Sequence, residues 1–222
     1  MNVIKSKLIQ IQIEKVIAAL GKNNMQGYYA KDRNEVLEIA KSLLSEGDTV
    51  ASGGSVTLDE CGIIALLRSG KYNYLDRAVP GLSKEQIREV YVKTFDADVF
   101  LCSANAITLD GKLYNVDGNS NRTAALLYGP KSVVVVAGYN KIVPDIEAAA
   151  KRVKTMAAPC NCMRLNCETF CHEKGVCMEA DNDEFGSGCS SDGRICCNYV
   201  ISAKQRHKDR TKVILVGEEL GY

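Results

Sequence analysis

The chain has 222 residues and a formal net charge of +1, with 28 basic and 27 acidic side chains. This balance provides no field to attract nucleic acid or an anionic membrane. No apolar run approaches the roughly 20 residues of a transmembrane helix, and polar residues near the N-terminus argue against a signal peptide. We therefore expect a cytosolic protein with a single domain over residues 1–222.

Two helices are predicted at the start of the chain. Apolar residues at helical spacing predict the first over residues 3–20. Its wide apolar stripe should pack on the domain or on a partner chain, so a homodimer is an open alternative. Residues 25–30 are interpreted as a polar-aromatic connector. A second helix should begin at Asp32, because Glu35 stands three residues later at capping-box spacing.

A strand, a glycine turn and a helix follow. The strand is predicted over residues 48–51 and the helix over 56–68, with Gly53 and Gly54 between them. Glycines let a backbone approach a ligand, and a helix start offers N–H groups to an anion. A tight turn without a ligand explains the pattern as well. The turn matches neither a phosphate-binding Walker loop nor a dinucleotide fingerprint, so no NAD site is expected.

The remaining elements alternate in type. Strands are predicted over residues 71–75, 99–101, 133–136, 195–201 and 212–216, and helices over 83–94 and 144–156, the last ended by Pro159. Strands that alternate with helices predict an α/β fold with an open, mostly parallel sheet.

A polar stretch over residues 105–122 follows the predicted strand 99–101, which is where open α/β sheets place their sites. Its candidate ligand-binding residues are Asn105, Asn115, Gly118, Asn119 and Arg122, with Arg122 as a bidentate anion clamp. Asp110 and Asp117 are candidate general bases. The alternative is a hairpin with two turns, in which Asn and Asp only bind nearby backbone.

Two further polar residues, Asn140 and Lys141, follow the predicted strand 133–136. By the same strand-end rule they should face the crevice of the 105–122 stretch. A solvated loop lysine is the alternative.

Eight of the ten cysteines lie within a cysteine-rich segment over residues 159–197. Cys61 and Cys102 fall in predicted core elements and should be inert buried thiols. In a reducing compartment, such density favours metal over disulfides. The spacing matches neither paired zinc ligands nor a bacterial ferredoxin, so free thiols and disulfides stay open. His172 adds one nearby ligand.

Three sequence stretches resemble the LUD-domain family, which includes the lactate-utilisation protein C group. They are SANAITLDGKLYNVDGNSNRTAALLYGP followed by VVVVAGYNKIV, then GGSVTLDECGI, and the final KVILVGEELGY. The resemblance implies a Rossmann-like sheet similar to ribose-5-phosphate isomerase, glucosamine-6-phosphate deaminase and the coenzyme A transferases. By that likeness the anionic end of a ligand is held by Gly53, Gly54, Ser55 and Thr57. The reacting end would meet Asp110, Asn115, Asp117 and Asn119.

Short family members of this kind end in a cysteine motif, which this chain partly keeps. The likeness implies a four-thiolate site of Cys171, Cys177, Cys189 and Cys196, holding an iron–sulfur cluster or zinc. Phe170 replaces the family's proline, and twelve positions separate Cys177 from Cys189 where the family has a short gap.

Two functions remain open at this stage. The first is a LUD-domain protein of lactate, 2-hydroxy-acid or related small-molecule metabolism. It would bind an anionic small molecule such as a 2-hydroxy acid or a sugar phosphate, as an enzyme or as a subunit of an electron-transfer complex. The second is a non-catalytic ligand-binding or regulatory module with a structural zinc or other thiolate site. Neither involves nucleic acid or a membrane.

Overall fold

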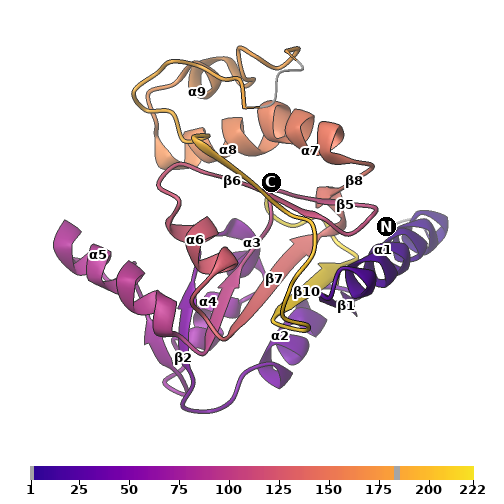
Figure 1. Cartoon of the computed structure of the whole chain (residues 1–222), viewed down its shortest axis with the longest axis vertical. Coiled ribbons are helices and arrows are strands. Elements are labelled where there is room, and N and C mark those ends of the chain that lie inside the picture. The colour runs from indigo at the N-terminus through magenta and orange to yellow at the C-terminus, as the bar shows by residue number, and fades with distance from the viewer. Residues whose placement is uncertain (1–2, 183–185) are drawn as a thin grey trace.

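A computed structural model describes residues 3–182 and 186–222 of the chain. Its centre is a six-stranded sheet with all neighbouring strands parallel (Figure 1). In spatial order the strands are β1 (Gln26–Ala30), β10 (Thr211–Val216), β7 (Ser132–Gly138), β4 (Val99–Cys102), β2 (Thr49–Ser52) and β3 (Asn73–Leu75). The predicted fold class, an α/β protein with a mostly parallel sheet, is confirmed.

The edge strand β1 corrects the sequence interpretation, which took these residues as a connector. It pairs along its whole length with β10. The sequence QGYYA has no aliphatic run, because an edge strand needs only one neighbour and its tyrosines are half-buried. Gly27 lies against α1 (Val3–Lys22), and a Cβ there would meet Ile17 at 2.9 Å.

Helices cover both faces of this sheet, as the alternation along β7 requires. Val133 and Val135 face the core shared with α1 and α6 (Asn121–Leu127). Val134 and Val136 face the core shared with α2 (Arg33–Ser42) and the helices that follow β2. As predicted, the Asp32 side chain caps α2, by accepting from the N–H groups of the second and third helical residues.

The predicted helix over residues 56–68 is two short helices. They are α3 (Val56–Glu60) and α4 (Ile63–Leu67). Gly62 between them has a φ of 68°, a left-handed conformation that glycine adopts without steric cost.

A second sheet has four strands, two from the polar stretch and two from later in the chain. Its order is β8 (Ile142–Val143), β5 (Ala106–Thr108), β6 (Leu113–Asp117) and β9 (Asn198–Ser202). Strands β5 and β6 are an antiparallel hairpin. The hairpin alternative is therefore correct for the first half of the polar stretch. One face of the hairpin packs on the core that includes α1, and the other packs on α7 (Ile146–Arg152) and the helical turn after it.

The cysteine-rich segment is entered through one continuous helical run. It consists of α7 (Ile146–Arg152), a π-helical turn η3 (Val153–Ala157) and α8 (Ala158–Leu165), and α9 (Phe170–Lys174) follows. Pro159 does not end the helix, as the sequence interpretation had it. It stands in the first turn of α8, where the missing N–H is tolerated. Residues 183–185 of the segment lie outside the described ranges.

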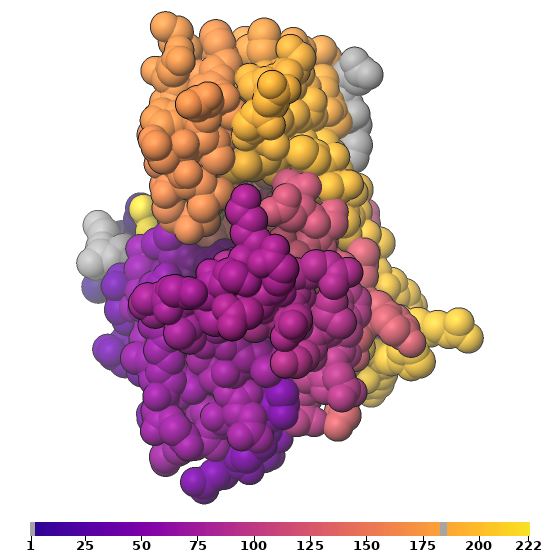
Figure 2. Space-filling model, turned by 90° about the vertical axis from the view of Figure 1, so that its left-hand side faces the viewer, coloured from indigo at the N-terminus to yellow at the C-terminus, as the bar shows by residue number. Residues whose placement is uncertain are grey.

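The remaining helical elements are short and lie between strands. They are α5 (Lys84–Lys93), η1 (Thr94–Asp96) and η2 (Tyr139–Lys141). Among the helices described, none combines the length and the apolar character that a membrane crossing requires. In Figure 2 the cysteine-rich segment (orange) stands as a separate block above the N-terminal half of the chain, and a furrow runs between them.

Candidate functional site

A cavity of about 410 Å³ lies between the carboxyl ends of the central strands and the cysteine-rich segment. Strands β2 and β4 are neighbours, but the chain runs outward from β2 to β3 and then crosses back to β4. Such a change of direction is where open α/β sheets bind ligands. The loops after β2, β4 and β7 all reach this cavity, as the strand-end rule predicted.

Nine of the sequence-predicted residues line the cavity. They are Gly54, Ser55, Thr57, Asn105, Asp117, Gly118, Asn119, Arg122 and Lys141. The turn after β2, the second half of the polar stretch and the loop after β7 therefore meet at one place, as expected.

Lys141 is a buried member of the cavity wall, with 3% of its surface exposed. Its Nζ donates to Thr57 Oγ1 and to Ser103 Oγ, each at 2.9 Å. In the described part of the chain, no carboxylate forms an ion pair with it. The alternative of a solvated loop lysine is therefore wrong.

The surroundings of Lys141 strongly disfavour its charged form. Burial first, and then the nearby Arg152 and Arg122 guanidinium groups, lower the pKa of the amine to about 7, against a weaker opposing effect of Glu60 and Cys61. An unperturbed lysine has a pKa near ~10.4. At neutral pH a substantial fraction of Lys141 is a free amine, which can act as a base or a nucleophile.

Arg122 is a structural centre of the cavity wall. Its Nη1 donates to Ser103 O (3.1 Å) and Asn115 Oδ1 (2.6 Å), and its Nη2 donates to Asn105 Oδ1 (3.0 Å) and Val116 O (2.8 Å). These four bonds use both Nη atoms. The arrangement ties the end of β4 to the end of β6 and leaves little of the guanidinium for a bidentate ligand.

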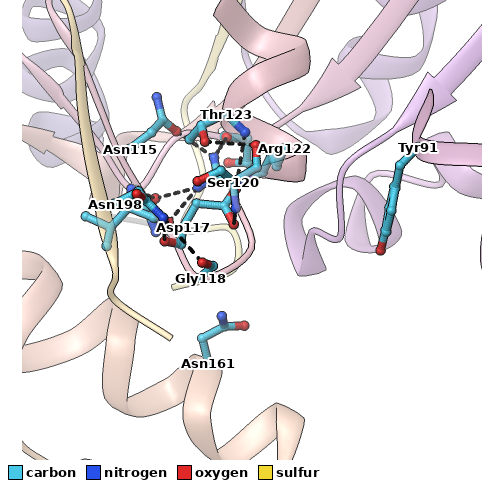
Figure 3. Close-up of polar contacts among 12 residues, drawn as sticks. Tyr91, Asn115, Asp117, Gly118, Ser120, Arg122, Thr123, Asn161 and Asn198 are labelled. Atoms are coloured by element: carbon cyan, nitrogen blue, oxygen red, sulfur yellow. Dashed lines mark hydrogen bonds and ion pairs between the residues drawn. The ribbon is translucent and has the colours of Figure 1, made fainter. Parts of the chain in front are cut away.

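Asp117 caps the helix after it. Its Oδ1 accepts from Ser120 N (3.1 Å) and its Oδ2 from Thr123 N (3.1 Å), while Arg122 Nε lies 3.7 Å from Oδ2 (Figure 3). Ser120 itself has a φ of 60°, which is unusual for a residue with a side chain. Both carboxylate oxygens thus hold the backbone turn that presents Gly118 to the cavity.

Three predicted residues lie behind the cavity wall. A Cβ on Gly53 would meet the Arg122 side chain at 3.1 Å, so this glycine makes room for the arginine. Asn115 accepts from Arg122 and is 1% exposed. Asn140 Oδ1 accepts from Leu220 N at 3.2 Å, which holds the last described residues beside the cavity.

Asp110 is not brought to the cavity. It lies in the turn between β5 and β6, where it pairs with Lys112 at 2.6 Å and accepts from the Thr108 hydroxyl. Hydrogen bonds from Lys112 and Thr108 lower the pKa of its carboxyl. The adjacent Gly111 touches the backbone of α1, since a Cβ there would lie 2.7 Å from Leu20 N.

Several cavity residues were not predicted from the sequence. They are Arg77, Tyr91, Ser103, Asn161, Arg164, Arg194 and Tyr222. Arg77 closely follows β3, so the strand-end rule applied to that strand would have found it. Ser103 directly follows β4, and the same rule applies to it. The others belong to α5, the cysteine-rich segment or the end of the chain, and no local pattern sets them apart.

The charge of the described cavity lining is strongly positive. Five of its side chains are basic, namely Arg77, Arg122, Lys141, Arg164 and Arg194, and Asp117 is its one acidic residue. Arg194 donates to Gly186 O, Cys189 O and Cys196 O.

Two arginines keep donors for a ligand. In the described structure, Arg77 Nη1 donates to Tyr91 Oη (3.0 Å). Arg164 donates through Nε and Nη2 to Asn161 and Tyr222. Arg77 Nη2 and Arg164 Nη1 have no partner among the described residues. Figure 3 shows Tyr91 and Asn161 standing apart from the Asp117 network, on elements across from it.

The four thiols of the expected metal site lie near enough to one another to interact electrostatically. Burial raises the pKa of Cys177, and the thiols of Cys196, Cys171 and Cys189 raise it further. All ten cysteines are free thiols. Within residues 3–182 and 186–222, however, no three His, Cys, Asp or Glu side chains converge as metal ligands. The donor chemistry suits a soft metal, while the arrangement of the thiols is not that of a closed site.

Comparison with known families decides which family this is. The family model described as the LUD domain matches residues 13–216. The chain belongs to the LUD-domain family. The chain is similar to the crystal structure of a DUF162 family protein from Deinococcus radiodurans. The match covers 95% of this chain and 97% of that chain, with 16% identity and a TM-score of 0.50.

Partial likenesses to other solved structures cover about half of the chain. One is eIF2B delta from Chaetomium thermophilum, at 21% identity, with 50% of this chain and 48% of that chain covered and a TM-score of 0.35. Another is ribose 5-phosphate isomerase from Plasmodium falciparum, at 16% identity, 50% and 52% coverage and a TM-score of 0.32. No curated protein matches the sequence.

Proposed function

We propose that this LUD-domain protein binds a small anionic metabolite in the cavity, with a carboxylate or phosphate group as the recognised feature. The single observation that carries the proposal is the charge of the lining, in which five basic side chains face one carboxylate. A 2-hydroxy acid or its oxidised counterpart is the class that the family's link to lactate utilisation favours.

Arg77 and Arg164 are the proposed contacts to the anion. Arg77 Nη2 and Arg164 Nη1 make no hydrogen bond to another described residue, so both can donate to a ligand. A guanidinium can hold a carboxylate through two parallel bonds. They come from different sides of the cavity, one beside β3 and one from α8. A ligand that touches both would bridge the sheet and the cysteine-rich segment.

Calorimetry with lactate, pyruvate and inorganic phosphate tests this proposal. We expect binding of at least one of them to wild-type protein. The Arg77→Ala and Arg164→Ala variants should each weaken it about tenfold, the equivalent of ~1.4 kcal/mol. Arg206→Ala is the charge-matched control, because Arg206 is exposed and lines a different surface hollow. Equal affinity in all four proteins, or no binding of any probe, would contradict the proposal.

A thiolate metal site in the cysteine-rich segment is a second proposal. The closeness of Cys171, Cys189 and Cys196 to Cys177 supports it. Metal analysis and visible absorption of anaerobically purified protein would distinguish an iron–sulfur cluster, which supports an electron-transfer role, from zinc, which supports a structural module. Cys177→Ser should lower the metal content and Cys61→Ser should not. Equal metal content in both variants, or none in wild type, refutes the site.

A further inference from the structure

The hydrogen bonds of Lys141 determine which position around Nζ carries the lone pair of the neutral amine. A neutral amine has two N–H donors and one lone pair, and both donors are taken by Thr57 Oγ1 and Ser103 Oγ. Those hydroxyls in turn donate to Leu220 O and Ala104 O, each at 3.4 Å, so both accept from the amine. The remaining tetrahedral position of Nζ carries the lone pair. Lys141 lines the cavity, and its Nζ would lie 3.4 Å from a Cβ on Gly221, another lining residue.

The groups around Lys141 keep the amine neutral without pairing it. Arg152 and Arg122 oppose its charge from α7 and α6, and Glu60 and Cys61 beside α3 only weakly favour it. Cys102 at the end of β4 is fully buried, and burial raises the pKa of its thiol to about 11, so it adds no negative charge near neutral pH. A buried lysine kept as a free amine is costly for stability, which suits a nucleophile better than a structural residue.

We propose that Lys141 is a catalytic amine that forms an imine with a small anionic carbonyl compound bound in the cavity, a 2-oxo acid being the smallest of this class. The inference rests on the proposed anion site, because the arginines would hold the acid group while the carbonyl carbon meets Nζ. The cavity of about 410 Å³ has room for a compound of this size.

The step balances without any oxidant or metal. The Nζ lone pair forms a bond to the carbonyl carbon, the π electrons move to the oxygen, and one N–H proton passes to that oxygen to give the carbinolamine. The hydroxyl group then takes a proton from solvent and leaves as water, and the second N–H proton returns to solvent. The products are one imine and one water. A proton gained from solvent makes the imine an iminium, which stabilises negative charge on the neighbouring carbon and so permits proton exchange there.

Borohydride trapping tests the proposal. The protein is incubated with pyruvate at pH 7.5, reduced, digested and mapped by mass spectrometry. We expect Lys141 to carry at least tenfold more label than any other lysine, although it is buried, since ordinary lysines are almost fully protonated at this pH. Labelling of Lys141 should rise through about pH 7. Acetone, which lacks the acid group, should label it far less.

The variant Lys141→Met keeps a neutral side chain of similar length but cannot form an imine, and Lys208→Met is its exposed control. Circular dichroism establishes that both fold. The proposal is overturned if the most exposed lysines carry the most label. It is also overturned if pyruvate and acetone label Lys141 equally. If calorimetry detects pyruvate binding to wild type and no adduct forms at Lys141, the imine is refuted while the anion site stands. Absence of any binding refutes both.

Discussion

The two sides of the cavity are built by different means. On one side, parallel strands end in loops that carry Lys141, Thr57 and Ser103, and the apolar residues of those strands are buried. On the other side, the described residues between α9 and β9 form no helix or strand. There, Arg194 alone donates to three backbone carbonyls. Figure 1 shows this segment above the sheet, joined to it through the helical run from α7.

This difference separates two roles in the cavity. The sheet side is held by regular backbone hydrogen bonds and a continuous core, so its reactive groups are preorganised. The cysteine-rich side depends on a few side chains, and local opening there costs less than global unfolding. We therefore expect substitutions in the sheet to act on the whole fold and those in the segment to act locally.

The largest effect should come from the sheet core. Leu101 of β4 is fully buried in the core that the sheet forms with α3 and α4. Leu101→Ala should lower the free energy of unfolding by about 3 kcal/mol, through lost burial and a cavity. Urea denaturation measures it. Met163→Ala, on the exposed side of α8, should change stability little, and an equal loss in both variants would erase the contrast between the two regions.

Lys141 gives the next effect, and its sign is opposite. The pKa of Lys141 is about 7 in the folded state, and that of a lysine in the unfolded chain is ~10.4. As pH falls between these values, the unfolded chain binds a proton that the folded chain does not, so stability falls. This charge effect amounts to about 4 kcal/mol at pH 7. Loss of the two hydrogen bonds from Nζ offsets about half of it, so Lys141→Met should stabilise the protein by about 2 kcal/mol at pH 7.

That gain should shrink as the pH rises toward 10, because the unfolded amine then also begins to lose its proton. Thermal denaturation of wild type and Lys141→Met across pH 6 to 10 measures it. A difference that does not vary with pH would show that the amine is not held neutral in the fold.

A smaller and local effect is expected in the cysteine-rich segment. Arg194→Ala removes the hydrogen bonds to Gly186 O, Cys189 O and Cys196 O. Hydrogen exchange should show protection lost by about 1.5 kcal/mol around these residues, with the sheet unchanged. Arg206→Ala is the matched exposed control. Uniform loss over the whole chain would mean that the segment and the sheet unfold as one unit.

The smallest effect is expected at α5. Ser83 and Gln86 form the predicted capping box, and none of the residues of α5 is buried. Ser83→Ala should cost about 1 kcal/mol, seen as faster exchange in α5. Because Tyr91 of this helix lines the cavity, anion binding should weaken slightly as well. Unchanged exchange in α5 would show that packing on the sheet, rather than the cap, holds this helix.

The sequence by itself determined most of the order of strands and helices and the edge of the sheet where the cavity lies, although it missed β1, β8 and the break between α3 and α4. Hydrophobic periodicity and capping are local properties, and strand ends converge wherever strands are parallel. The polar stretch over residues 105–122 also indicated the LUD-domain family. The sequence left open whether this stretch is a ligand-binding loop or a hairpin.

Only the tertiary structure decided the roles of individual side chains. The amine of Lys141 is kept neutral by burial and by Arg152, which is distant along the chain from most of the lining. Arg122 is occupied by carbonyl and amide oxygens from β4, β6 and their loops, and Asp110 is carried away by its hairpin. Burial, charge proximity and the use of donors depend on contacts between remote segments, and no local pattern in a sequence encodes them.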